Sequence, residues 1–116
     1  MSWFHDVQQK AGQVQQREEE RRRVVFEVVS EKVLPLLKTS IEECAAQGMT
    51  KMTFGPTEYV DADIIASIKG AKYKDVSVYT VAFCDVFYTE LQKHRDFKGF
   101  KINKVTETIL SISWTP

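Results

Sequence analysis

The sequence predicts an α/β protein, bordering on the α+β class, with a long N-terminal helix and a small mixed sheet. Apolar residues follow helical spacing through residues 1–47, and short alternating segments then interchange with helical ones. The expected order is helix, strand, helix, strand, helix, strand, strand. In this arrangement three or four strands pair with one another, and two further helices cover them.

The N-terminal residues 1–23 are expected to form a helical arm, separate from a single domain over residues 24–116. Apolar side chains in the arm recur with the 3-4-3 spacing of a short coiled coil, and an indole lies beside them. These residues are Trp3, Phe4, Val7, Ala11 and Val14. In the polar run that follows, Glu18 precedes Arg22 by four residues and Glu19 precedes Arg23 likewise, an order that supports a solvated helix.

Residues 24–47 carry a second helical face, which we expect to be buried. Pro35 lies within this run, where it removes a backbone hydrogen bond, so a kink or a break is expected near Leu34. Gly48 stands where a helix ends. A straight helix over residues 2–47 would be ~69 Å long, whereas a compact domain of this size has a radius of gyration of ~13 Å. Either the helix breaks or its N-terminal part projects.

After Gly48, segments in which apolar residues alternate as in a strand take turns with segments in which they follow helical spacing. Strands are expected at 51–54, 74–81, 100–105 and 108–114, and helices between them, the first capped by Thr57 or Asp61 and the second ended by Gly99. The predicted core comprises apolar residues of these segments: Phe54, Val76, Val78, Phe83, Phe87, Leu91, Ile102, Leu110 and Ile112, packed against Val60, Ile64 and Ile68.

Composition excludes several classes of protein. The 16 basic and 16 acidic residues cancel, so the chain as a whole does not attract nucleic acid or an anionic membrane. We expect no membrane association, because no apolar run approaches the ~20 residues that span a bilayer. The N-terminal residues lack the features of a secretory signal. Two cysteines form no disulfide framework, which indicates a reducing compartment and a cytoplasmic location.

Cofactor and metal motifs are not found in the sequence. The five glycines are scattered singly, so they cannot form a phosphate-binding loop, and we expect no cofactor. His5 and His94 lack further ligands at metal-binding spacing, and we expect no metal site. Asp61 and Asp63 point to different sides of a helix, where capping explains them.

Two further features of the sequence are candidate functional sites. Cys84 follows a predicted strand at the start of a helix, where a thiol of low pKa can act as a nucleophile. A buried structural cysteine is the simpler interpretation. A basic stretch can contact phosphate or an acidic protein, although cations also suit helix ends and strand edges. Its residues are Lys93, Arg95, Lys98, Lys101 and Lys104.

The C-terminal segments resemble an ending found in small phage and viral accessory proteins. Gly99-Phe100-Lys101-Ile102 resembles a strand that follows an amphipathic helix in those proteins, and Ile112-Ser113-Trp114 resembles their closing strand. The resemblance covers about the last 30 residues. It implies a small viral protein that works by binding, in the host cytoplasm or the virion, and it assigns no activity to any residue.

Taken together, the sequence favours a non-enzymatic interaction or structural protein that associates with itself through its N-terminal helix. Its expected partners are further copies of the chain, another protein, or both. One alternative is a nucleic-acid-associated protein that uses the basic stretch, and another is a small enzyme with a site near Cys84. For the arm itself, the alternative is that it folds back onto the domain.

Overall fold

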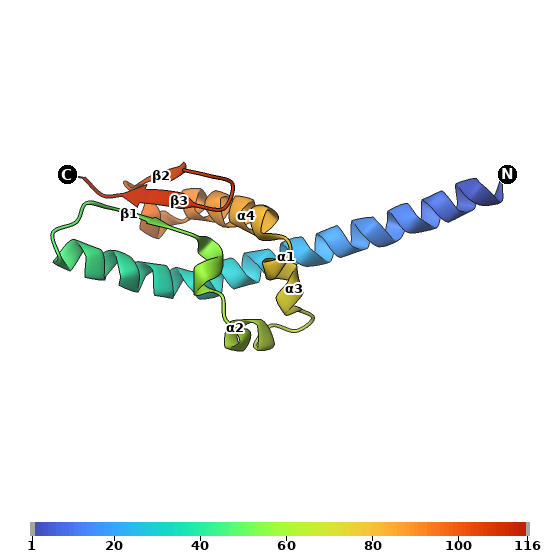
Figure 1. Ribbon diagram of the computed structural model, residues 1–116, viewed down its shortest axis with the longest axis horizontal. Coiled ribbons are helices and arrows are strands. Elements are labelled where there is room, and N and C mark those ends of the chain that lie inside the picture. The colour runs from blue at the N-terminus through green and yellow to red at the C-terminus, as the bar shows by residue number, and fades with distance from the viewer. Residues whose placement is uncertain (1, 116) are drawn as a thin grey trace.

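The computed structural model describes residues 2–115 and has an α+β fold (Figure 1). A long helix, α1 (Trp3–Ala46), is followed by β1 (Lys51–Phe54) and the 3₁₀ turn η1 (Pro56–Tyr59). Three helices come next, α2 (Ala62–Ala66), α3 (Tyr73–Ser77) and α4 (Thr80–Lys93). The turn η2 (Arg95–Phe97) leads to β2 (Lys101–Lys104) and β3 (Leu110–Ser113).

Helix α1 continues through Pro35, so the expected break near Leu34 does not occur. Pro35 lies on the exposed side, while Leu34 and Leu37 beside it are buried. Packing of these neighbours holds the helix across the one missing hydrogen bond. Of the two alternatives for the long helix, the projecting N-terminal part is confirmed. The projection gives the molecule a radius of gyration of 17.5 Å and extents of 66 × 27 × 22 Å.

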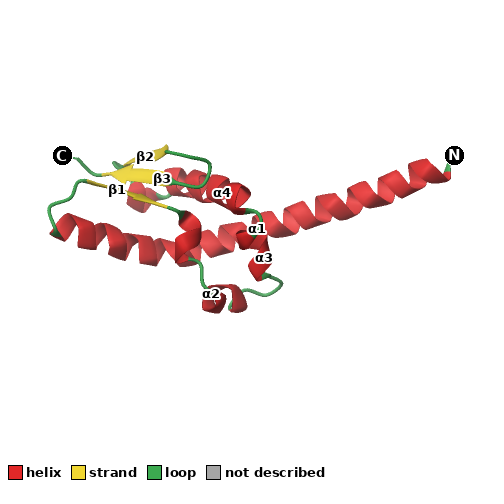
Figure 2. Ribbon diagram, viewed as in Figure 1, coloured by secondary structure: helices red, strands yellow, loops and turns green. Residues whose placement is uncertain are grey.

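The three strands form an antiparallel sheet in the order β1-β3-β2. Ile112 of the central strand is paired with Met52 on one side and Ile102 on the other. The strands predicted at 51–54, 100–105 and 108–114 are therefore confirmed, the last two with shorter bounds. The sheet packs on α1 and α4, which also pack on each other; in Figure 2, α1 runs below the strands and α4 lies at their level.

The strand predicted at 74–81 is wrong, because this segment forms α3 and the start of α4. Its β-branched residues favoured a strand, but Asp75 accepts a hydrogen bond from the backbone N–H of Lys72 at 3.0 Å and so caps a helical turn. Only Val76 of the alternating set is buried, and Val78 is 69% exposed rather than in the core. Without this strand the sheet has no parallel pair and is not mixed.

The core lies between α1, α4 and the sheet. Four phenylalanine rings, from Phe26 through Phe83 and Phe87 to Phe54, follow one another with centroids 5.6, 6.0 and 6.1 Å apart. Most of the predicted core is confirmed, but Ile65 rather than Ile64 is the buried isoleucine of α2.

Among residues 2–115, no helix has the length and apolar character required to cross a bilayer.

Candidate interaction surface

The projecting arm is shorter than the predicted 1–23: residues 3–20 of α1 extend beyond the rest of the molecule (Figure 1), whereas Arg21 and Arg22 contact Asp75 and Tyr79. From here on, the arm means residues 3–20. Ser2 caps it, since its hydroxyl accepts a hydrogen bond from the N–H of His5 at 3.2 Å. We call the apolar side chains on one side of the arm the stripe, and all of them are exposed: Trp3 (80%), Phe4 (66%), Val7 (44%), Ala11 and Val14 (58%). The structure therefore brings the five predicted residues together on a projecting helix, and the arm does not fold back.

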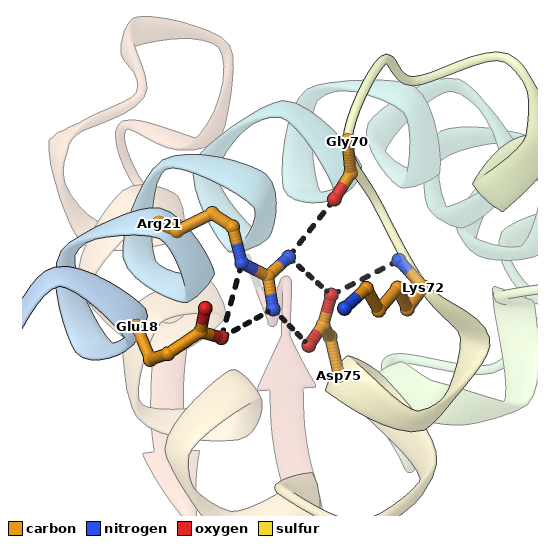
Figure 3. A network of polar contacts seen from close by, with 5 residues as sticks. All are labelled: Glu18, Arg21, Gly70, Lys72 and Asp75. Atoms are coloured by element: carbon orange, nitrogen blue, oxygen red, sulfur yellow. Dashed lines mark hydrogen bonds and ion pairs between the residues drawn. The ribbon is translucent and has the colours of Figure 1, made fainter. Parts of the chain in front are cut away.

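A polar network marks the point where the arm meets the body, residues 21–115 (Figure 3). Both terminal nitrogens of Arg21 donate to the carboxylate of Asp75 at 2.8 Å. The same guanidinium donates to the carbonyl of Gly70 at 2.9 Å and to Glu18 at 3.1 Å. The contacts join α1 to the loop and helix that follow α2, so they fix where the arm leaves the body.

The network also shifts the acidity of both partners. The hydrogen bonds from Arg21 hold the pKa of Asp75 below its usual value, against the opposing effect of burial. The pKa of Arg21 is raised in turn, chiefly by the hydrogen bond to Asp75. The Asp75 side chain is only 2% exposed, so its negative charge depends on the arginine for compensation.

The charge pairs expected within the arm are arranged differently. Glu18 pairs with Arg21 rather than with Arg22, and Arg23 pairs with Glu27 at 3.8 Å rather than with Glu19. Arg22 instead lies over the ring of Tyr79, 4.1 Å from its centroid. Arg21 and Arg22 turn toward the body because Asp75 and Tyr79 lie beside α1 at this point, whereas Arg23 stays 75% exposed and pairs within α1.

A mostly polar groove lies beside Arg22, at the corner where the arm meets the body. It is lined by Val14, Gln15, Glu18, Glu19, Arg22 and Tyr79. Close by in the sequence, Val78 and Val81 at the α3–α4 junction are 69% and 42% exposed.

The structure places Cys84 in the core, 1% exposed. Burial raises the pKa of its thiol, which is the opposite of what a thiolate nucleophile requires.

Asp61 caps the N-terminus of α2, as predicted, because its carboxylate accepts a hydrogen bond from the N–H of Ile64 at 2.8 Å. Within residues 2–115, no three His, Cys, Asp or Glu side chains gather as a metal site would need.

The basic stretch is exposed but partly neutralised by acidic neighbours. It runs from the end of α4 to the edge strand β2. Lys104 pairs with Asp85, and this contact raises the pKa of the lysine. Asp96 within the stretch pairs with Lys38, which lowers the pKa of the carboxyl. The aromatic side chains of the stretch turn inward, since Phe97 is buried and contacts the ring of Phe100.

Sequence patterns do not predict the network of Arg21 and Asp75. Arg21 lies in the polar run of the predicted arm, and Asp75 lies in the predicted strand 74–81, which the structure shows to be helical. The spacing of Lys72 and Asp75, with a carboxylate at the third position of a helix, is a signal for a helix start. Its partner in α1 lies 54 residues away in the sequence, a distance over which no local pattern operates.

Comparisons of the chain with protein families, characterised proteins and solved structures gave no match. The interpretation of the stripe, the corner and the polar network therefore rests on the chemistry and geometry of these residues.

Proposed function

We propose that this protein acts through binding rather than catalysis, and that it associates with itself through the stripe on its arm. One observation carries the proposal: five apolar residues lie exposed on one side of a helix that stands clear of the body. Monomeric proteins rarely keep such a surface without a use. Burial of apolar surface between two copies contributes about 25 cal/mol per Å².

The arm also needs a neighbour for its own stability. Most of the stability of a helix in a protein comes from packing of its apolar side, which the arm lacks, and Gly12 weakens this helix further by about 1 kcal/mol. The arm is held at its base by Arg21, but the side chains of the stripe remain exposed. A partner helix laid along the stripe orders the arm and covers its apolar side chains at once.

The setting we propose is the cytoplasm, since Cys44 and Cys84 are both free thiols. A small viral accessory or structural protein is the class that the C-terminal likeness suggests. In such a protein the body would serve as a second binding surface, carried by the self-associating arm.

The test compares two double variants that add the same charge to opposite sides of the arm. Val7→Glu with Val14→Glu places two carboxylates on the stripe. Gln9→Glu with Gln16→Glu places two on the opposite side, because each lies two residues from a stripe position and so about 200° around the helix. We expect the parent protein and the glutamine variant to form dimers or larger assemblies at tens of micromolar, and the valine variant to be monomeric by light scattering.

Two results would contradict the proposal. A parent protein that stays monomeric at high concentration has no self-association to explain. Equal masses for the two double variants would place the contact outside the stripe. Circular dichroism of each variant checks that the body remains folded, as we expect for substitutions at exposed positions.

A further inference from the structure

The stripe has the same spacing in both directions along the helix. From Phe4 to Val14, its members are separated by three, four and three residues, a spacing that is symmetrical about Gln9. A second copy that runs in the opposite direction therefore presents Val14 opposite Phe4 and Ala11 opposite Val7, in four apolar layers. Resting on the self-association proposed above, we infer that two copies pair through their arms as an antiparallel, two-fold symmetric dimer.

The position of the body supplies the argument for direction. Val7 and Val25 are 18 residues apart, as are Ala11 and Val29, and this separation is about five helical turns. The stripe therefore lies on the same side of α1 as Val25 and Val29, which are buried against the body at 4% and 0% exposure. The body stands on the side of α1 to which a partner helix must bind.

A parallel pair is blocked by this arrangement. Both bodies would lie at the same end of the pair, each on the side facing the other helix. Paired helices are only ~8–10 Å apart. The molecule measures 27 and 22 Å across its long axis, far more than the ~10–12 Å of a single helix, and the body accounts for this width. The two bodies would have to occupy the same space.

An antiparallel pair avoids the conflict. The bodies then lie at opposite ends, each beyond the N-terminus of the other copy. In the symmetrical register, Trp3 of one copy reaches the level of Gln15 of the other. That level is six residues before Arg21, or ~9 Å along the helix, so the arm ends before it meets the Asp75 contact of its partner.

Side chains beside the stripe set the strength of this pair. In the antiparallel register Trp3 lies near Arg17 of the second copy, where an indole and a guanidinium attract each other. The two Lys10 side chains lie near the symmetry axis and repel each other. Removing that charge with Lys10→Gln should tighten an antiparallel pair, whereas in a parallel pair Lys10 faces Gln15 and the substitution changes little.

Spin labels at two exposed positions of α1 distinguish the two directions. One label is placed at Gln9→Cys, near the axis, and another, in a separate variant, at Arg23→Cys, whose side chain is 75% exposed. Both variants carry Cys44→Ser, and Cys84 is too buried to react. In an antiparallel dimer the labels at position 23 are offset by 28 residues along the helix, or ~42 Å. Those at position 9 have almost no offset.

We therefore expect a clearly longer distance at position 23 than at position 9, measured by pulsed electron paramagnetic resonance. Equal distances in a sample that light scattering shows to be dimeric would overturn the antiparallel geometry and leave self-association through the stripe standing. A monomeric sample would overturn both proposals. A dimer that persists when residues 2–16 are deleted would likewise overturn both, because it would place the contact on the body.

Discussion

Residues 3–20 and 21–46 belong to one helix, and both carry an apolar side with helical spacing. In the second segment that side is covered: Val29, Val33 and Leu37 have no exposed area. In the first it is open, with Phe4 66% exposed. The spacing thus predicts a helix and the side that will be buried, but not what will bury it. The body covers α1 only as far as Arg21, and we propose that a second copy covers the rest.

The largest expected contrast is between a phenylalanine in the body and one in the arm. Phe87 has no exposed area and packs edge-on against Phe54. Phe87→Ala should lower the free energy of unfolding by about 3–5 kcal/mol through lost burial and a residual cavity. Phe4→Ala should leave it unchanged in urea titrations at a concentration where the protein is monomeric. A comparable loss in both would mean that the arm packs on the body in solution.

The junction between arm and body should give the next largest effect. Asp75→Ala removes the paired contact with Arg21 and the bond to the N–H of Lys72. We expect a loss of about 2–3 kcal/mol, less than for a fully buried pair because Arg21 remains partly solvated. Glu18→Ala is the matched control. Its 48% exposed carboxylate should contribute no more than about 1 kcal/mol in the same titrations.

The same contact should make stability depend on acidity. The pKa of Asp75 is lower in the folded protein than in the unfolded chain. Its contribution is therefore fully present above the unfolded value of about 3.9, and it is lost as the pH falls through the folded value. In melting experiments from pH 6 downward, Asp75→Asn should show a flatter acid dependence than the parent. Parallel curves would mean that other carboxylates set the acid limit.

A smaller effect is expected within the arm at Gly12. An added methyl group there meets no atom within 4 Å, so Gly12→Ala should stabilise the arm helix by about 1 kcal/mol. Hydrogen exchange of arm amides should slow several-fold. Gly48→Ala is the opposite control, since its φ of +84° strains any residue with a Cβ. Faster exchange in the arm after Gly12→Ala would contradict a helical arm.

The smallest effect should follow from removing most of the arm. Deletion of residues 2–16 leaves Arg21 and its contacts in place, so the free energy of unfolding of the body should change by less than about 0.5 kcal/mol under monomeric conditions, as for surface changes. Thermal or urea unfolding measures this directly. A marked loss of stability would show that the arm supports the body.

Local patterns predicted the long helix, the three strands and the C-terminal glycine of α1, because each depends on near neighbours. The stripe was also readable, since Phe4, Val7 and Val14 are spaced for one side of a helix. The strand prediction for 74–81 is wrong because Val76 and Val78 have strand propensity, whereas the Asp75 carboxylate caps a helical turn at Lys72 and is held there by Arg21, 54 residues away. Tertiary contacts of this kind are not encoded in spacing.

Helix α1 passes from the arm into the body without a hinge, since it is one element from Trp3 to Ala46. A rotation or tilt of the N-terminal end of the arm is therefore transmitted to the body. When that end is bound, the body is held at a fixed distance from the bound partner and in a fixed orientation about the helix axis. In an antiparallel pair, the surfaces of the two bodies would face outward at a fixed spacing and relative angle, so that any ligands they bind would be aligned as well as brought near.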